Sequence, residues 1–151
     1  MRIAVAALLM SAALGVSGAP AADEGSFVVI VAASNPATSI RRQELARFFL
    51  KKTGRWNDGR GVVPVDLSAG SPVRSAFTRA VLSVEGMGQI SSVQNFWLQQ
   101  VYSGRSSPPT VKATDAEVLA FVAANPGAIG YIATASTCGS PGNATAKPSV
   151  M

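Results

Sequence analysis

Two apolar runs, each followed by a loop and then a helical pattern, constrain this chain most strongly. Residues 27–31 form a continuous β-branched run, which is typical of strands covered on both faces. Residues 62–66 repeat the pattern ahead of a helix predicted from Ser71 through Phe77 to Leu82. Strands that alternate with helices predict an α/β domain with a mostly parallel sheet in three layers.

The next two helical patterns fit this alternation. Ser39 is predicted to cap a helix in which Leu45, Phe48 and Phe49 lie on one face. Residues 87–101 carry apolar side chains at spacings of three and four, which predicts an amphipathic helix. Each of these helices is long enough to cover part of a sheet.

The C-terminal half supplies two more strands and one helix. Residues 111–113 are predicted to form a short strand. The sequence from Thr114 to Glu117 is a capping box, which predicts a helix beginning directly after Thr114. Residues 128–132 then return to a buried strand pattern.

The N-terminus has the features of a secretory signal peptide. Arg2 precedes an apolar stretch from residue 3 to 14, and small residues follow at positions 19–21. We therefore expect a signal peptide at residues 1–21, one α/β domain at 22–137 and a disordered tail at 138–151. The mature protein is expected to be periplasmic or secreted, with no further membrane span.

Missing residue types argue against an enzyme. The sequence contains no histidine and one cysteine, Cys138. Without histidine, the commonest general base and the commonest metal ligand are absent, so we expect no cofactor and no metal site. Asp115 and Glu117 have no paired carboxylate in view. A serine hydrolase is the remaining enzymatic alternative, and it lacks an obvious base.

Positive charge is concentrated in one part of the chain. The formal net charge of +5 becomes +4 when Arg2 is removed. Residues 41–79 hold nine basic side chains against three acidic ones, an excess of six. The nine are Arg41, Arg42, Arg47, Lys51, Lys52, Arg55, Arg60, Arg74 and Arg79. This distribution suggests small anions, anionic lipid or an acidic protein as partners, and the expected compartment argues against nucleic acid; the alternative is a solvated face.

The loop before the helix at Ser71 is the leading candidate site. Ser71 is a good N-cap and Pro72 stands at the first helical position, where its missing N–H costs nothing. The N–H groups and the positive dipole end of such a helix attract an oxyanion such as phosphate or sulfate. The candidate ligand-binding residues are Ser68, Gly70, Ser71 and Arg74. Each also has a structural interpretation. In it, Ser68 hydrogen-bonds to the backbone, Gly70 provides the loop geometry, Ser71 caps the helix and Arg74 is solvated.

Three polar residues near strand ends have two readings each. Ser34 and Asn35 either face the same anion across the sheet edge or initiate a turn before a proline. Asp66 either accepts a hydrogen bond from a protonated oxyanion or pairs with a nearby arginine.

Several landmarks follow one another along residues 27–133. They are Phe49-Leu50-Lys51-Lys52-Thr53, Trp56-Asn57-Asp58, Val63-Pro64-Val65-Asp66 with Gly70-Ser71, Phe96-Trp97, and Asn125-Pro126-Gly127-Ala128. This series resembles the phosphate-type periplasmic solute-binding proteins of ABC transporters. The resemblance implies the fold of one lobe of a type 2 periplasmic binding protein, with phosphate ligands drawn from the strand, the Gly-Ser loop and the helix.

The chain departs from that family in two respects. It has the length of about one lobe, and Pro72 and Val73 stand where the family loop has a glycine and a threonine. We therefore expect weak oxyanion binding linked to transport or sensing, with an ABC permease as partner. The alternative is a ligand-free interaction module whose basic face docks on an acidic envelope protein. A homodimer that rebuilds the missing lobe is compatible with both readings.

Overall fold

Four strands form one open sheet in the order β1-β4-β2-β3. They are β1 (Phe27–Val31), β2 (Val63–Leu67), β3 (Thr110–Lys112) and β4 (Ala128–Ala133). β2 runs parallel to both of its neighbours, β3 and β4. β1 runs antiparallel to β4, so the sheet is mostly parallel, as predicted, with one antiparallel edge strand.

The computed structural model describes residues 25–139. The predicted signal peptide at 1–21 and residues 140–151 of the predicted tail lie outside the described residues. In the described part, no helix is long and apolar enough to cross a membrane.

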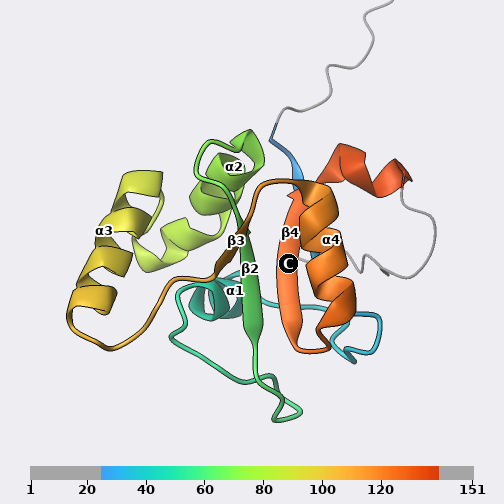
Figure 1. Cartoon of the computed structure of the whole chain (residues 1–151), viewed down its shortest axis with the longest axis horizontal. Coiled ribbons are helices and arrows are strands. Elements are labelled where there is room, and N and C mark those ends of the chain that lie inside the picture. Colours follow the sequence, from blue (N-terminus) through green and yellow to red (C-terminus); the bar gives the residue numbers. More distant parts are fainter. Residues whose placement is uncertain (1–24, 140–151) are drawn as a thin grey trace, which may run out of the picture.

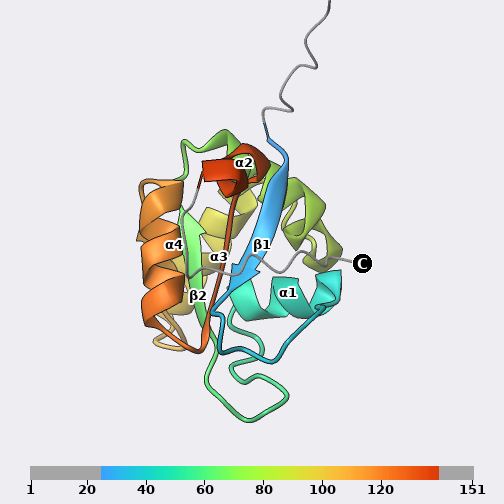
Figure 2. The same cartoon turned by 90° about the vertical axis from the view of Figure 1, so that its right-hand side faces the viewer.

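The helices cover both faces of the sheet and complete three layers (Figures 1 and 2). Figure 2 shows α4 on one side of the sheet and α1 and α2 on the other. The α-helices are α1 (Arg42–Phe49), α2 (Pro72–Ala80), α3 (Ile90–Tyr102) and α4 (Asp115–Ala124). Two 3-10 helices, η1 (Leu82–Glu85) and η2 (Thr134–Gly139), follow α2 and β4.

Aromatic side chains join α1 and α2 to the sheet. The rings of Phe77 on α2 and Tyr131 on β4 are stacked, with centroids 3.9 Å apart and planes 2° apart. Phe49 on α1 packs against both rings at 4.7 and 5.7 Å. All three side chains are almost fully buried, so this stack anchors one helical layer to the sheet.

Two predicted helix boundaries are wrong. Arg41, not Ser39, is the N-cap residue of α1, because its own backbone is still extended, at φ −73° and ψ 143°. Its side chain makes no capping bond. The helix predicted through Leu82 ends at Ala80 and tightens into η1. Gly86 stops η1 in the left-handed region, at φ 78°.

The capping box before α4 is confirmed. Thr114 Oγ1 accepts a hydrogen bond from the Glu117 N–H at 3.3 Å. The Glu117 carboxylate accepts in return from the N–H groups of Thr114 and Ala113, at 3.1 and 2.9 Å. These two backbone donors lower the pKa of Glu117.

The direction of β1 places the loop after β1 far from the loop after β2. The loop from residue 33 to 38 follows β1, whereas the loop from residue 67 to 71 follows β2. Because β1 is antiparallel to β4 and β2 is parallel to it, these two strands end at opposite edges of the sheet. Of the two interpretations of Ser34 and Asn35, the one in which they face the same anion as Ser71 is therefore wrong. The structure has the turn, in which Asn35 Oδ1 accepts a hydrogen bond from the Ala37 N–H at 2.9 Å.

Gly130 lets α4 approach the sheet closely. A Cβ atom at Gly130 would lie 2.7 Å from Val65 Cγ1 and 2.8 Å from Val118 Cγ1. Val65 belongs to β2 and Val118 to α4, and both are fully buried. The position therefore has room only for a hydrogen atom between a neighbouring strand and the covering helix.

We predict that Gly130→Ala destabilises the protein, because the methyl group forces both valines to move. The free energy of unfolding should fall by about 1–3 kcal/mol, the usual range for overpacking, in urea unfolding experiments. Gly54→Ala is the matched control, since a Cβ there meets no described atom within 4 Å. Equal stabilities of the two variants would contradict the close approach of α4.

Candidate functional site

The loop after β2 leads into a capped helix start, as predicted. Ser71 is the N-cap of α2, and its Oγ accepts a hydrogen bond from the Arg74 N–H at 3.4 Å. Pro72 stands in the first turn of α2. The Ser68 N–H donates to the carbonyl of Lys112, which fixes the loop to the neighbouring strand β3.

Two amides at this helix start have no protein acceptor. The Ser71 N–H donates to the carbonyl of Ser68 at 3.0 Å, and the Arg74 N–H is taken by the cap. The N–H groups of Gly70 and Val73 donate to no atom among residues 25–139. They lie at the positive end of α2, where the helix dipole favours a negative charge.

The guanidinium of Arg74, the predicted cation of the site, is already bonded to other groups of the protein. Its guanidinium is buried, with 8% of the residue exposed. Nη2 lies 3.0 Å from Asp66 Oδ2, and Nη1 donates to the Leu67 carbonyl at 2.8 Å. Its charge is therefore matched by a carboxylate at the end of β2. Of the two interpretations of Asp66, the structure supports the one in which it pairs with an arginine.

The Asp66 carboxylate accepts two further hydrogen bonds, both at Oδ1. The Leu67 N–H donates to Oδ1 at 2.9 Å, and the Tyr131 hydroxyl donates to the same oxygen. Burial raises the pKa of Asp66, while the positive charge of Arg74 opposes that rise. Burial and the nearby carboxylate also raise the pKa of Tyr131, which keeps its hydroxyl protonated and able to donate.

The role of Tyr131 is not identified by the sequence analysis. It lies in β4, whose other side chains are apolar or absent, and it is fully buried. A buried tyrosine hydroxyl needs a hydrogen-bond partner, which is the signal that points to a polar group nearby. The partner, Asp66, comes from a different strand and is brought close by the sheet.

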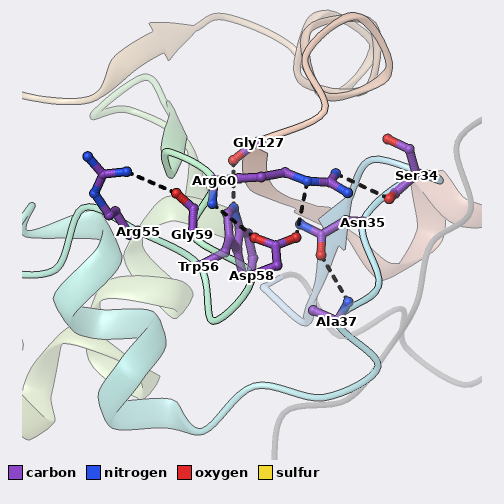
Figure 3. A network of polar contacts seen from close by, with 9 residues as sticks. All are labelled: Ser34, Asn35, Ala37, Arg55, Trp56, Asp58, Gly59, Arg60 and Gly127. Atoms are coloured by element: carbon purple, nitrogen blue, oxygen red, sulfur yellow. Dashed lines mark hydrogen bonds and ion pairs between the residues drawn. The ribbon is translucent and has the colours of Figure 1, made fainter.

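A second polar cluster lies at the opposite edge of the sheet (Figure 3). Arg60 Nε lies 3.1 Å from Asp58 Oδ2, and Arg60 Nη1 donates to the Ser34 carbonyl at 3.3 Å. The Trp56 indole N–H donates to the carbonyl of Gly127, just before β4, at 3.0 Å. Trp56 is buried in the core. The bond from Arg60 to the Ser34 carbonyl ties the loop after β1 to the turn before β2.

Most of the concentrated positive charge lies on the surface. Of the nine basic residues between positions 41 and 79, Arg74 is buried and the other eight are exposed. Glu85 pairs with two of them, Lys52 at 2.7 Å and Arg47 at 3.4 Å. These partners lower the pKa of Glu85, with the Lys52 hydrogen bond as the larger cause.

The acidic and cysteine side chains lie apart from one another in the described part of the chain. No group of three or more Cys, Asp or Glu side chains comes together among residues 25–139. The donors that the structure does gather are backbone amides, hydroxyls and one buried ion pair, which suit binding by hydrogen bonds.

Comparisons with known proteins connect the fold to phosphate receptors. No protein-family model and no curated protein sequence matches the chain. A solved structure of an ABC-type phosphate transport receptor from Vibrio cholerae is similar, with 18% identity, a TM-score of 0.53, and coverage of 73% of this chain and 41% of that one. PstS from Borrelia burgdorferi gives 13% identity, a TM-score of 0.55, and coverage of 74% and 42%.

These similarities concern the fold. The chain spans about two fifths of the length of each of these receptors. Its α/β domain is therefore similar to one lobe of PstS-like periplasmic binding proteins. What the receptors bind does not carry over to this chain at such low sequence identity.

We predict that Arg74→Met strongly destabilises the protein, because it leaves the Asp66 carboxylate buried without its cation. The free energy of unfolding should fall by about 3–5 kcal/mol, the usual effect of breaking a buried pair. Arg79→Met is the matched control, because Arg79 is exposed in the last turn of the same helix. Chemical denaturation that finds the two variants equally stable would contradict the buried pair.

Proposed function

We propose that this protein is an exported, single-lobe solute-binding protein and not an enzyme. It binds a small oxyanion, phosphate or sulfate, at the loop from residue 67 to 74 and serves transport or sensing with an ABC permease. The observation that carries the proposal is the pair of unpartnered amides, Gly70 and Val73, at the Ser71-capped start of α2. The fold shared with phosphate receptors supports it.

Each candidate residue has a distinct part in this binding. The exposed Gly70 brings its amide to the anion without a side chain in the way, since nothing lies within 4 Å of a Cβ placed there. Ser68 and Ser71 are half-buried beside it and offer hydroxyl groups. Arg74 contributes as a positioning residue, because its bond to the Leu67 carbonyl holds the start of the loop.

The expected affinity is low. Three hydrogen bonds to a charged group at about 1.5–3 kcal/mol each give roughly 5–9 kcal/mol before the cost of association is subtracted. Because Arg74 is paired with Asp66, it offers no free positive charge to the anion. A single lobe also leaves the anion exposed to water, which weakens electrostatic attraction. We therefore expect a dissociation constant no tighter than about 10 μM, extending into the millimolar range.

Pro72→Ala should strengthen phosphate binding, because it restores an N–H in the first turn of α2. One charge-assisted hydrogen bond corresponds to about a tenfold lower dissociation constant in isothermal titration with inorganic phosphate. Pro126→Ala is the control, since Pro126 lies in the turn before β4 at the opposite edge of the sheet. The proposal fails if neither phosphate nor sulfate binds, or if the substitution leaves the affinity unchanged.

The exposed basic residues support a second candidate function, a protein-interaction module. Eight basic side chains between positions 41 and 79 are exposed, whereas Arg74, at the start of α2, is buried in its ion pair. In this alternative the surface docks on an acidic envelope protein, and a homodimer is a further form of the same association.

We predict that the double variant Arg41→Gln/Arg42→Gln loses affinity for an immobilised polyglutamate peptide if the protein is such a module. Binding should also weaken with added salt, because exposed charges are screened. Arg105→Gln is the control, as it removes an exposed basic residue outside the concentrated stretch. Binding that is insensitive to salt and equal in both variants would exclude this function.

A further inference from the structure

The helix α3 exposes an apolar row that the fold does not use. Of its 13 residues, only Val93 and Trp97 are buried. Leu98 and Val101 are each 53% exposed, and Tyr102 is 88% exposed. These three are half of the six large apolar side chains that are exposed in the described part of the chain. Exposed apolar side chains that gather in one place mark an interaction surface.

A groove with a volume of ≈ 640 Å³ lies beside this apolar row. Leu98, Val101 and Tyr102 form one wall, and Pro108, from the segment that leads to β3, forms another part of the lining. The almost fully buried Trp97 also contributes to it. Figure 1 shows α3 at the periphery of the molecule, beside α2, where a partner can reach it.

The charges around this groove are all positive. None of its lining residues is acidic, and the sequence from residue 86 to 114 contains no Asp or Glu. Lys51 Nζ donates to the Pro108 carbonyl at 3.4 Å, which places an exposed ammonium group at the edge of the groove. Arg105, directly after α3, is exposed as well. A second copy of the chain would bring like charges together here, whereas an acidic partner is attracted.

We propose that this groove binds an amphipathic α-helix of a partner protein, with an apolar face flanked by acidic residues. Leu98, Val101 and Tyr102 follow the i, i+3, i+4 spacing of one helix face, which is the kind of ridge that packs against a second helix. A groove accepts protruding side chains, and a helix supplies them at regular spacing.

Each part of such a partner has a place in this groove. Its apolar side chains pack on α3 and Pro108, and its acidic side chains lie near Lys51 and Arg105. Apolar burial therefore drives this binding, and charge selects the partner. The inference does not depend on anion binding at the start of α2.

Three fluorescein-labelled model peptides provide a direct test. The first consists of two repeats of Leu-Ala-Glu-Leu-Leu-Glu-Glu, which places leucine on one helix face and glutamate on the other. The second has lysine in place of every glutamate, and the third has the composition of the first in an order that spreads leucine around the helix. In fluorescence anisotropy, the first should bind the protein at least about tenfold more tightly than either of the others.

Single substitutions connect the binding to the groove. Leu98→Ser and Tyr102→Ser should each weaken binding of the acidic amphipathic peptide about five- to tenfold, because each removes apolar surface that the peptide covers. Val84→Ser is the matched control, since Val84 is an apolar side chain of η1 that is 46% exposed and does not line the groove. It should leave the affinity unchanged.

Several results would overturn the proposal. One is that the acidic amphipathic peptide does not bind up to about 1 mM, or binds no better than the other two. Another is that Leu98→Ser and Tyr102→Ser bind it as tightly as Val84→Ser does. If Leu98→Ser does not fold, the more exposed Tyr102→Ser decides.

Two further measurements test other occupants of the groove. Sedimentation equilibrium that finds a dimer of the protein alone, lost in Tyr102→Ser, would assign the groove to a second copy and overturn the proposal. Binding to phosphatidylglycerol vesicles that Tyr102→Ser removes and the peptide does not compete with would also overturn it. Phosphate titration of Tyr102→Ser should match that of the unsubstituted protein, which keeps this test separate from the oxyanion site.

Discussion

The buried ion pair between Asp66 and Arg74 is the interaction on which the rest of the structure depends. It joins the end of β2 to the first turn of α2, and the Tyr131 hydroxyl extends it to β4. Two charges removed from water are tolerated only when their hydrogen bonds are satisfied, and here the Leu67 amide and carbonyl complete the set. The position of the loop before α2 follows from this network.

The same pair limits what the loop can do. A guanidinium that is bound to a carboxylate and a carbonyl offers no free charge to a ligand, so the anion that we propose to bind at α2 would rely on backbone amides. Backbone amides are fixed in direction and need no reorganisation, so the proposed site would be ordered but weak. The charge of Arg74 therefore stabilises the fold through Asp66 and is not free to stabilise a bound anion.

Local features of the sequence predict most elements and fail where distant segments meet. Apolar runs and capping residues identify all four strands and the starts of α2 and α4, because these signals act within a few residues. The direction of β1 leaves no trace in its sequence, since side chains alternate identically in parallel and antiparallel strands. The bond from Tyr131 to Asp66 also emerges only from the folded chain, because the two residues lie on different strands.

The shortness of β3 affects how the molecule behaves when crowded. At three residues, with the Val111 side chain half exposed, this strand closes one side of the sheet. An edge strand this short presents few free amides and carbonyls, which are too few to pair with a strand from another molecule. Pairing of the sheet with another molecule through its β3 edge is therefore disfavoured.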